Sequence, residues 1–152
     1  MPTTLGRKYK TDWLGNPPHM LDTDVPVWHR FLEQWGSIFT EFYYDCLVGG
    51  PSYTPEQLKD PMLRMWRANA SKRIDAVGFT ADQVWIIEVA TSPGLRSLGQ
   101  LQVYRALWLE DPPIIKIEVP VLVCEVVDQD LIYAASVYGV LTIVCPPLFT
   151  VY

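Results

Sequence analysis

Histidine, cysteine and unbroken apolar runs are scarce in this chain, and each scarcity excludes a class of function. The two histidines, His19 and His29, have no serine or cysteine partner at a spacing typical of nucleophilic catalysis. The three cysteines lie far apart, each inside an apolar stretch, and they lack the spacing of a metal site. We expect buried free thiols in a reducing compartment.

Membrane and secretion signals are also lacking. Residues 133–152 carry no charge, but Gly139, Pro146 and Pro147 interrupt them, which indicates core elements and no membrane span. The first ten residues, MPTTLGRKYK, contain no apolar core of a secretion signal. The two glycines of SPGLRSLG (92–99) fit no phosphate-binding loop and predict a helix-entry loop.

Positive charge is in short supply, because the net charge is −5, which is unlike a general nucleic-acid binder. The deficit is uneven. Residues 59–105 carry seven basic and four acidic side chains, whereas residues 106–152 carry one basic and six acidic ones. The central segment is compatible with a phosphate-facing surface and equally with a solvated, charged helix face.

The 152 residues suit one compact domain preceded by an arm. Residues 1–26 are rich in proline and glycine without a sustained period, so we expect an extended arm. Trp13 and Met20 in this arm need an apolar surface, on this domain or on a neighbouring subunit. Residues 27–152 form the predicted domain.

Helical and strand patterns alternate along that domain. Helices are predicted over 27–39, 54–70 (interrupted at Pro61), 95–109 and 128–139. Strands are predicted over 40–48, 73–79, 83–90, 114–127 and 140–145, the second and third forming a hairpin. This order predicts an α/β fold, a mixed sheet flanked by helices.

Two acidic residues lie in the predicted hairpin, Asp75 in RIDAVGF and Glu88 in QVWIIEVA. Carboxylates among apolar neighbours are costly unless they are paired or bind a cation. If the register brings them together, Mg²⁺ is one partner and Arg73 or Arg96 is the other. Arg96, Gln100 and Tyr104 share one face of the next helix and complete a small polar site.

These residues resemble the motifs of the PD-(D/E)XK nuclease superfamily, which has the restriction-endonuclease-like fold. Asp75 corresponds to its first acid and Glu88 to its second, while Gln100 and Tyr104 correspond to the Gln-x-x-x-Tyr motif of one branch. The resemblance covers roughly residues 27–145 and implies Mg²⁺-dependent DNA cleavage. It also implies a further acid on the first helix, for which Glu33 or Glu41 is a candidate.

Ala90 is the departure from the pattern, because active family members carry a lysine at this position. Lys72, Arg73 and Arg96 are candidates for a relocated basic residue. An arginine stabilises charge but stays protonated and cannot act as a base. The alternative is that Arg73 or Arg96 neutralises Asp75 and Glu88 as a structural ion pair. We favour this structural interpretation.

Three tryptophans have two interpretations. Trp66, Trp85 and Trp108 can stack on bases, but their apolar spacing predicts core positions. Arg64 and Arg67, beside Trp66, fit a phosphate contact or a solvated helix rim.

The function predicted from the sequence is therefore a non-catalytic structural or adaptor protein. Degenerate copies of this fold resemble small structural proteins of tailed bacteriophages, which implies a ring-like homo-oligomer at the neck or tail of a virion, assembled in the host cytoplasm. The 1–26 arm would contact neighbouring copies and other virion proteins, without a membrane or a cofactor. The alternatives are a Mg²⁺-dependent nuclease using Asp75 and Glu88, and a protein that binds DNA without cleaving it.

Overall fold

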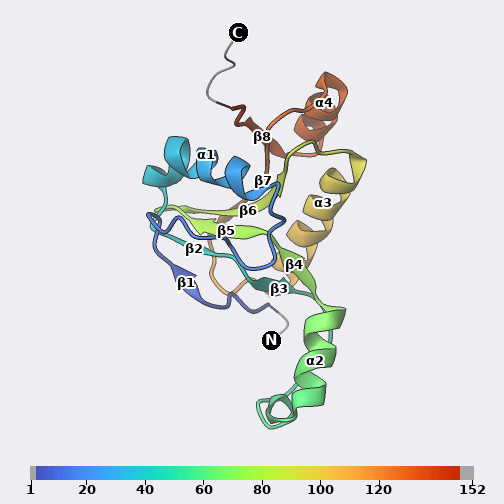
Figure 1. Cartoon of the computed structure of the whole chain (residues 1–152). Coiled ribbons are helices and arrows are strands. Elements are labelled where there is room, and N and C mark those ends of the chain that lie inside the picture. The colour runs from blue at the N-terminus through green and yellow to red at the C-terminus, as the bar shows by residue number, and fades with distance from the viewer. Residues whose placement is uncertain (1–2, 148–152) are drawn as a thin grey trace.

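The computed structural model describes residues 3–147 and shows a mixed α/β architecture (Figure 1). Six strands form one sheet in the order β1 (Lys8–Tyr9), β2 (Glu41–Tyr43), β5 (Ala76–Phe79), β6 (Gln83–Ala90), β7 (Ile117–Cys124) and β8 (Leu141–Val144). The β1–β2, β2–β5 and β5–β6 pairs are antiparallel, whereas β6, β7 and β8 are parallel. The first two residues of the predicted arm and residues 148–152 of the predicted domain lie outside the described range.

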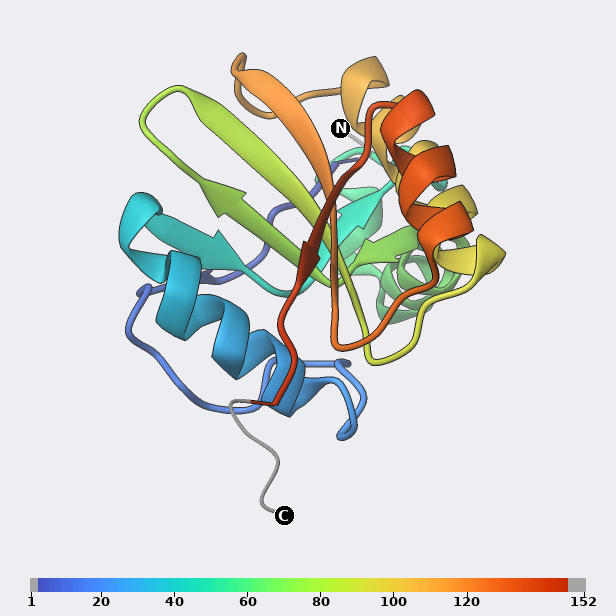
Figure 2. The same ribbon diagram turned by 90° about the horizontal axis from the view of Figure 1, so that it is seen from above.

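Three helices cover the two faces of this sheet. Figure 2 shows α1 (Val25–Trp35) on one side, and α3 (Leu95–Glu110) with α4 (Gln129–Val137) on the other. Side chains alternate along β6, so Trp85, Ile87 and Val89 join the cluster under α1, while Val84 and Ile86 join the cluster under α3 and α4. Burial on both faces explains why this strand is an almost unbroken apolar run.

Two segments that were predicted as single strands each contain two strands. The predicted strand 40–48 divides into β2 and β3 (Cys46–Val48), and the predicted strand 73–79 divides into β4 (Lys72–Ile74) and β5. The strands β3 and β4 pair with each other in a separate two-stranded ribbon. The side-chain pattern could not show this break, because the same apolar spacing continues while the pairing partner changes.

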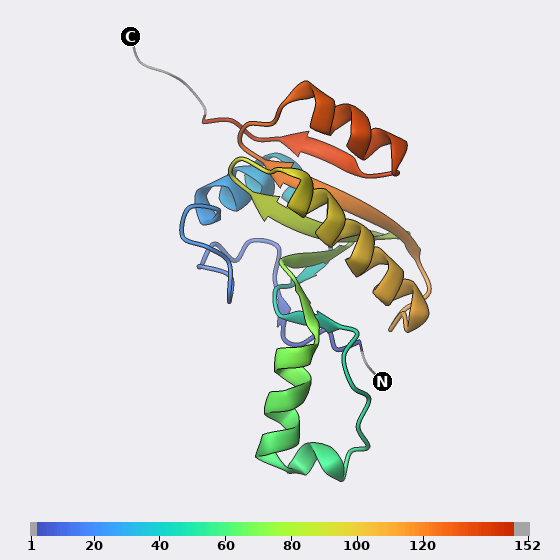
Figure 3. The ribbon, with the colours of Figure 1, turned by 90° about the vertical axis from the view of Figure 1, so that its right-hand side faces the viewer.

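The ribbon carries a helical segment away from the sheet. A 3₁₀ turn (Gln57–Lys59) and α2 (Pro61–Ala70) form two short helices, which confirms the interruption predicted at Pro61. The side chain of Asp60 accepts a hydrogen bond from the N–H of Met62 (2.9 Å), and Pro61 occupies the first turn. Figures 1 and 3 show α2 projecting from the body of the molecule.

The described part of the arm lies on the chain's own domain. The strand β1 extends the sheet beside β2, and Thr4 pairs with Leu47 of the ribbon. The rings of Tyr9 and Trp13 pack against each other and against Tyr44, with centroids 4.6 to 5.7 Å apart. The arm predicted as extended therefore includes a short strand and aromatic contacts of its own.

Of the predictions for the cysteines, the tryptophans and the remaining element bounds, some are confirmed and others are wrong. The three cysteines are free and buried, and Trp85 and Trp108 lie in the core, as predicted. Trp66 was predicted in the core, but 60% of its surface is exposed. The first helix ends at Trp35, before a 3₁₀ turn (Gly36–Ile38), and the strand predicted over 114–127 spans only 117–124. Among the helices described, none has the length and apolar character needed to cross a membrane.

Candidate functional site

Asp75 and Glu88 meet where β4 gives way to β5. The pairing of Ala76 with Ile87 places the preceding residue, Asp75, opposite Glu88 on the neighbouring strand. The N–H of Val89 donates to Asp75 Oδ2 at 2.9 Å, and the two carboxyl groups share a hydrogen bond. The hairpin register therefore brings together the two acids that the sequence singled out.

The pair holds a proton because it is withdrawn from water. Burial, and then the charge of Asp75, raise the pKa of Glu88 to about 9. Burial also raises the pKa of Asp75, to about 6. The hydrogen bond from the N–H of Val89 has the opposite effect and lowers the pKa of Asp75. At neutral pH the pair therefore retains a proton between its two carboxyl groups. Glu88 is 8% exposed, and its Oε2 atom has no hydrogen-bond partner.

A third acid, Asp24, faces the same pair. It precedes α1 and is buried, and its Oδ1 atom accepts hydrogen bonds from the N–H and the hydroxyl of Thr91, both at 2.9 Å. Its negative charge raises the pKa of both Asp75 and Glu88. The contact between Asp24 and Thr91 spans 67 residues, so no local sequence pattern reveals it.

The polar stripe on α3 points toward the acids. The positive charge of Arg96 lowers the pKa of Glu88, which places its guanidinium within electrostatic reach. Burial, and then the charges of Glu88 and Asp75, raise the pKa of Tyr104, while a hydrogen bond with Gln100 opposes them. The structure thus places Arg96, Gln100 and Tyr104 around the acid pair.

The other predicted basic residues lie elsewhere. Arg73 forms an ion pair with Asp45, and therefore does not neutralise Asp75 as one alternative proposed. Lys72 is exposed, and its Nζ atom lies 3.5 Å from the carbonyl oxygen of Ala70. Both belong to the β3–β4 ribbon, which leaves the main sheet just before Asp75, so strand alternation does not carry Arg73 into the site.

The predicted further acids also lie outside this group. Glu33 is exposed on α1 and lines a hollow beside the arm. Glu41 hydrogen-bonds with the hydroxyl of Tyr43 and pairs with Lys8 at 3.8 Å. The acid from this part of the chain whose charge acts on the pair is instead Asp24, which precedes α1.

The donor set fits a small, hard cation in part. The orphaned Oε2 of Glu88 and the adjacent Asp75 are oxygen ligands of the kind that Mg²⁺ prefers, and a cation would take the place of the shared proton. Within residues 3–147, however, no group of three or more histidine, cysteine or acidic side chains is arranged to hold a metal ion. Two carboxylates, with water completing the shell, are what this chain offers.

Comparisons with known proteins add no relative. No family model, no curated protein and no solved structure matches the chain. The site is therefore interpreted from its own geometry, which consists of a proton-sharing acid pair, a third buried acid, one arginine and an alanine at position 90.

Proposed function

We propose that this chain is a non-catalytic structural subunit built on a nuclease-like framework. The framework is the hairpin β5–β6 followed by α3 and the parallel strand β7, with Asp75 and Glu88 on the hairpin. This arrangement supports a restriction-endonuclease-like topology as the finer description of the mixed sheet. The comparison with a nuclease fold rests on the sequence resemblance, and the non-catalytic assignment rests on the chemistry of the site.

The missing base is the observation that supports this proposal. Position 90 on β6 is an alanine, and Lys72 and Arg73 belong to the separate ribbon. Arg96 is the remaining cation near the pair, and it stays protonated, so it cannot take a proton from an attacking water. Burial raises the pKa of Glu88 and so opposes the ionisation that a metal ligand needs.

The assembly proposed for this subunit is a homo-oligomer in a phage virion, at the head–tail neck or in the tail. This placement rests on the resemblance of the sequence to small tailed-phage proteins. The described arm packs on the chain's own sheet and forms its edge through β1. A contact between copies, or with another virion protein, through this arm would therefore add to the open edge of β1.

A Mg²⁺-dependent nuclease is the second candidate, because Glu88 Oε2 is buried without a partner beside Asp75, Arg96 and Tyr104. Such an enzyme would use Asp75 and Glu88 to hold the metal and Arg96 to stabilise charge on the phosphate. Binding of DNA without cleavage is a third outcome, recognised by steep salt dependence.

Cleavage of single- and double-stranded DNA with Mg²⁺ or Mn²⁺ separates these functions. The wild type is compared with Asp75→Asn and Glu88→Gln, which keep the shape of the acids, and with Ala90→Lys. We expect no cleavage by the wild type. Cleavage that both acid variants abolish would overturn the non-catalytic assignment. Activity only in Ala90→Lys would support the non-catalytic assignment, because it would show that the missing lysine is what keeps the wild-type site inactive.

A further inference from the structure

The strand β8 is an open edge of the main sheet. Among the described residues it pairs only with β7, and Figure 2 shows it running between α1 and α4. The N–H of Cys145, just after β8, donates to the carbonyl oxygen of Cys124 (2.7 Å), and backbone groups along a strand point to alternate sides. The N–H and C=O groups of Thr142 and Val144 therefore face away from β7, where another strand can bond to them.

The two edges of this sheet differ in charge. The opposite edge, β1, has two residues, and three basic side chains lie between positions 7 and 10; short, charged edges resist pairing. The strand β8 has four residues, and residues 131–147 carry no charged side chain. Arg30 reaches the end of β8, where it donates to the carbonyl oxygen of Cys145 (2.9 Å), but it is paired with Glu125 (2.6 Å). The β8 edge is therefore uncharged and lacks the protection that β1 has.

Apolar side chains surround the β8 edge. Five of them, on β8 and on the adjoining helix α4, are between 38% and 63% exposed: Ile132, Tyr133, Val137, Leu141 and Val144. An aromatic side chain presents about 150 to 250 Å² and an aliphatic one less, so the five leave on the order of 400 Å² of apolar surface exposed in each copy. Two copies that covered this surface would bury on the order of 800 Å², which is the size of a weak, transient interface.

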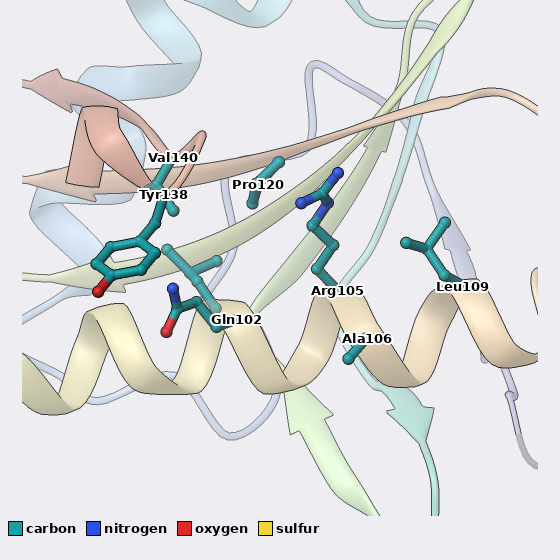
Figure 4. A pocket seen from close by; sticks show the side chains of 8 residues that line it. Gln102, Arg105, Ala106, Leu109, Pro120, Tyr138 and Val140 are labelled. Carbon is teal, nitrogen blue, oxygen red and sulfur yellow. The ribbon is translucent and has the colours of Figure 1, made fainter. Parts of the chain in front are cut away.

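Tyr138, although exposed, is not part of this surface. It lies over α3, where it lines a hollow of about 310 Å³ together with Arg105 and Pro120 (Figure 4). Arg105 is paired with Glu118 (3.0 Å), so the charge beside this hollow is balanced.

A second copy of this chain matches the edge in charge and in shape. The chain has a net charge of −5, so two copies repel each other unless they meet where neither carries charge. Two β8 edges meet this condition, because no like charges are opposed within residues 131–147. Each edge also offers the other an uncharged strand of the same length, with the same two residues facing outward.

We propose that β8 pairs antiparallel with β8 of a second copy across a two-fold axis, so that two sheets become one. An axis between the two Ile143 residues places Thr142 of each copy opposite Val144 of the other, and all the outward backbone groups of these residues are then bonded. Ile143 stays on the face that α1 covers, and the two α4 helices adjoin on the other face.

The proposed contact is isologous and closes at a dimer. A larger assembly would add the arm as a second contact. The inference goes beyond the proposed function, because a dimer is compatible with a structural subunit and with a nuclease.

Solution mass measured over a concentration series, together with amide hydrogen exchange, tests this dimer. Val144→Lys places a charge on the open edge. Val103→Lys is the matched control, because it makes the same change on α3 at a side chain of similar exposure. Thr142→Lys and Val144→Glu test the register, and thermal unfolding confirms that each variant is folded.

We expect the wild type to approach twice the 17.4 kDa monomer mass within roughly 10 to 500 µM, the range suited to a small interface. The amides of Thr142 and Val144 should exchange several-fold more slowly at the top of this range than at the bottom. Val144→Lys should raise the dissociation constant about tenfold or more, and Val103→Lys should leave it unchanged. An equimolar mixture of Thr142→Lys and Val144→Glu should dimerise more tightly than either variant alone, because opposite charges then face each other across the ladder.

Three results would overturn the β8 dimer. They are a wild type that stays monomeric, a Val144→Lys variant that dimerises like the wild type, and a dimer in which the amides of Thr142 and Val144 exchange as fast as in the monomer. Equal loss of the dimer in Val103→Lys would also overturn it and would assign the contact to α3. A mixture no tighter than its two components would overturn the proposed register. None of these measurements involves DNA, so failure of the dimer is distinguishable from failure of the non-catalytic assignment.

Discussion

The acid pair predicts a pH dependence of stability that the substitution Glu88→Gln removes. The pKa of Glu88 is raised from 4.5 to about 9 in the folded chain, chiefly by burial. Between these values the folded state keeps a proton that the unfolded state has released. The stabilisation is fully present below the ordinary pKa and is lost as pH rises toward the folded pKa.

One retained proton corresponds to a loss of about 1.4 kcal/mol in the free energy of unfolding per pH unit. From about pH 6.5 to about pH 8.5, where Asp75 with its pKa of about 6 is largely ionised, the wild type should lose roughly 3 kcal/mol from Glu88. Glutamine resembles the protonated acid and does not titrate, so this slope should be absent in Glu88→Gln.

Urea denaturation followed by tryptophan fluorescence, at several pH values and in a chelator, measures this slope. Glu33→Gln is the matched control, since it makes the same change at an exposed glutamate and should keep the wild-type slope. Equal slopes for the wild type and Glu88→Gln would refute the shared proton. A slope that Mg²⁺ removes from the wild type would instead favour the metal-binding candidate.

Two further predictions concern the core. Trp28, which is fully buried, packs on Phe31 and donates to the hydroxyl of Tyr44, so Trp28→Ala should cost about 3 to 5 kcal/mol of unfolding free energy, whereas the exposed Trp66→Ala should stay within about 0.5 kcal/mol. A Cβ on Gly78 would lie 2.7 Å from the rings of Phe39 and Phe42, so Gly78→Ala should cost about 1 to 3 kcal/mol. Gly99, inside α3 with open space around it, is the contrasting site, where Gly99→Ala should add up to about 1 kcal/mol. Chemical denaturation checks all four, and a Gly78→Ala variant as stable as the wild type would contradict the predicted clash.

Local patterns determined much of the fold. The apolar run QVWIIEVA, whose side chains alternate between the two faces of a strand, predicted β6 at its observed bounds, and the helix predicted over 95–109 matches α3 to within one residue. These signals are reliable because each residue's environment repeats with the period of the element. The same alternation placed Glu88 on the α3 face, where it meets the stripe that includes Tyr104.

Only the tertiary structure decided which residues join the site and which leave it. Strand alternation placed Arg73 beside Asp75, but the chain changes sheets between them, and a change of pairing partner leaves no trace in side-chain period. Asp24 enters the site through a contact 67 residues away, and Trp66 leaves the core because a ribbon carries its helix outward. The sequence by itself determined most of the helices and strands, and it singled out Asp75 and Glu88 as acids among apolar neighbours. Both results depend only on residues that are close together in the chain. The surroundings of those acids and the projecting surface depend on long-range packing, which local periodicity does not encode.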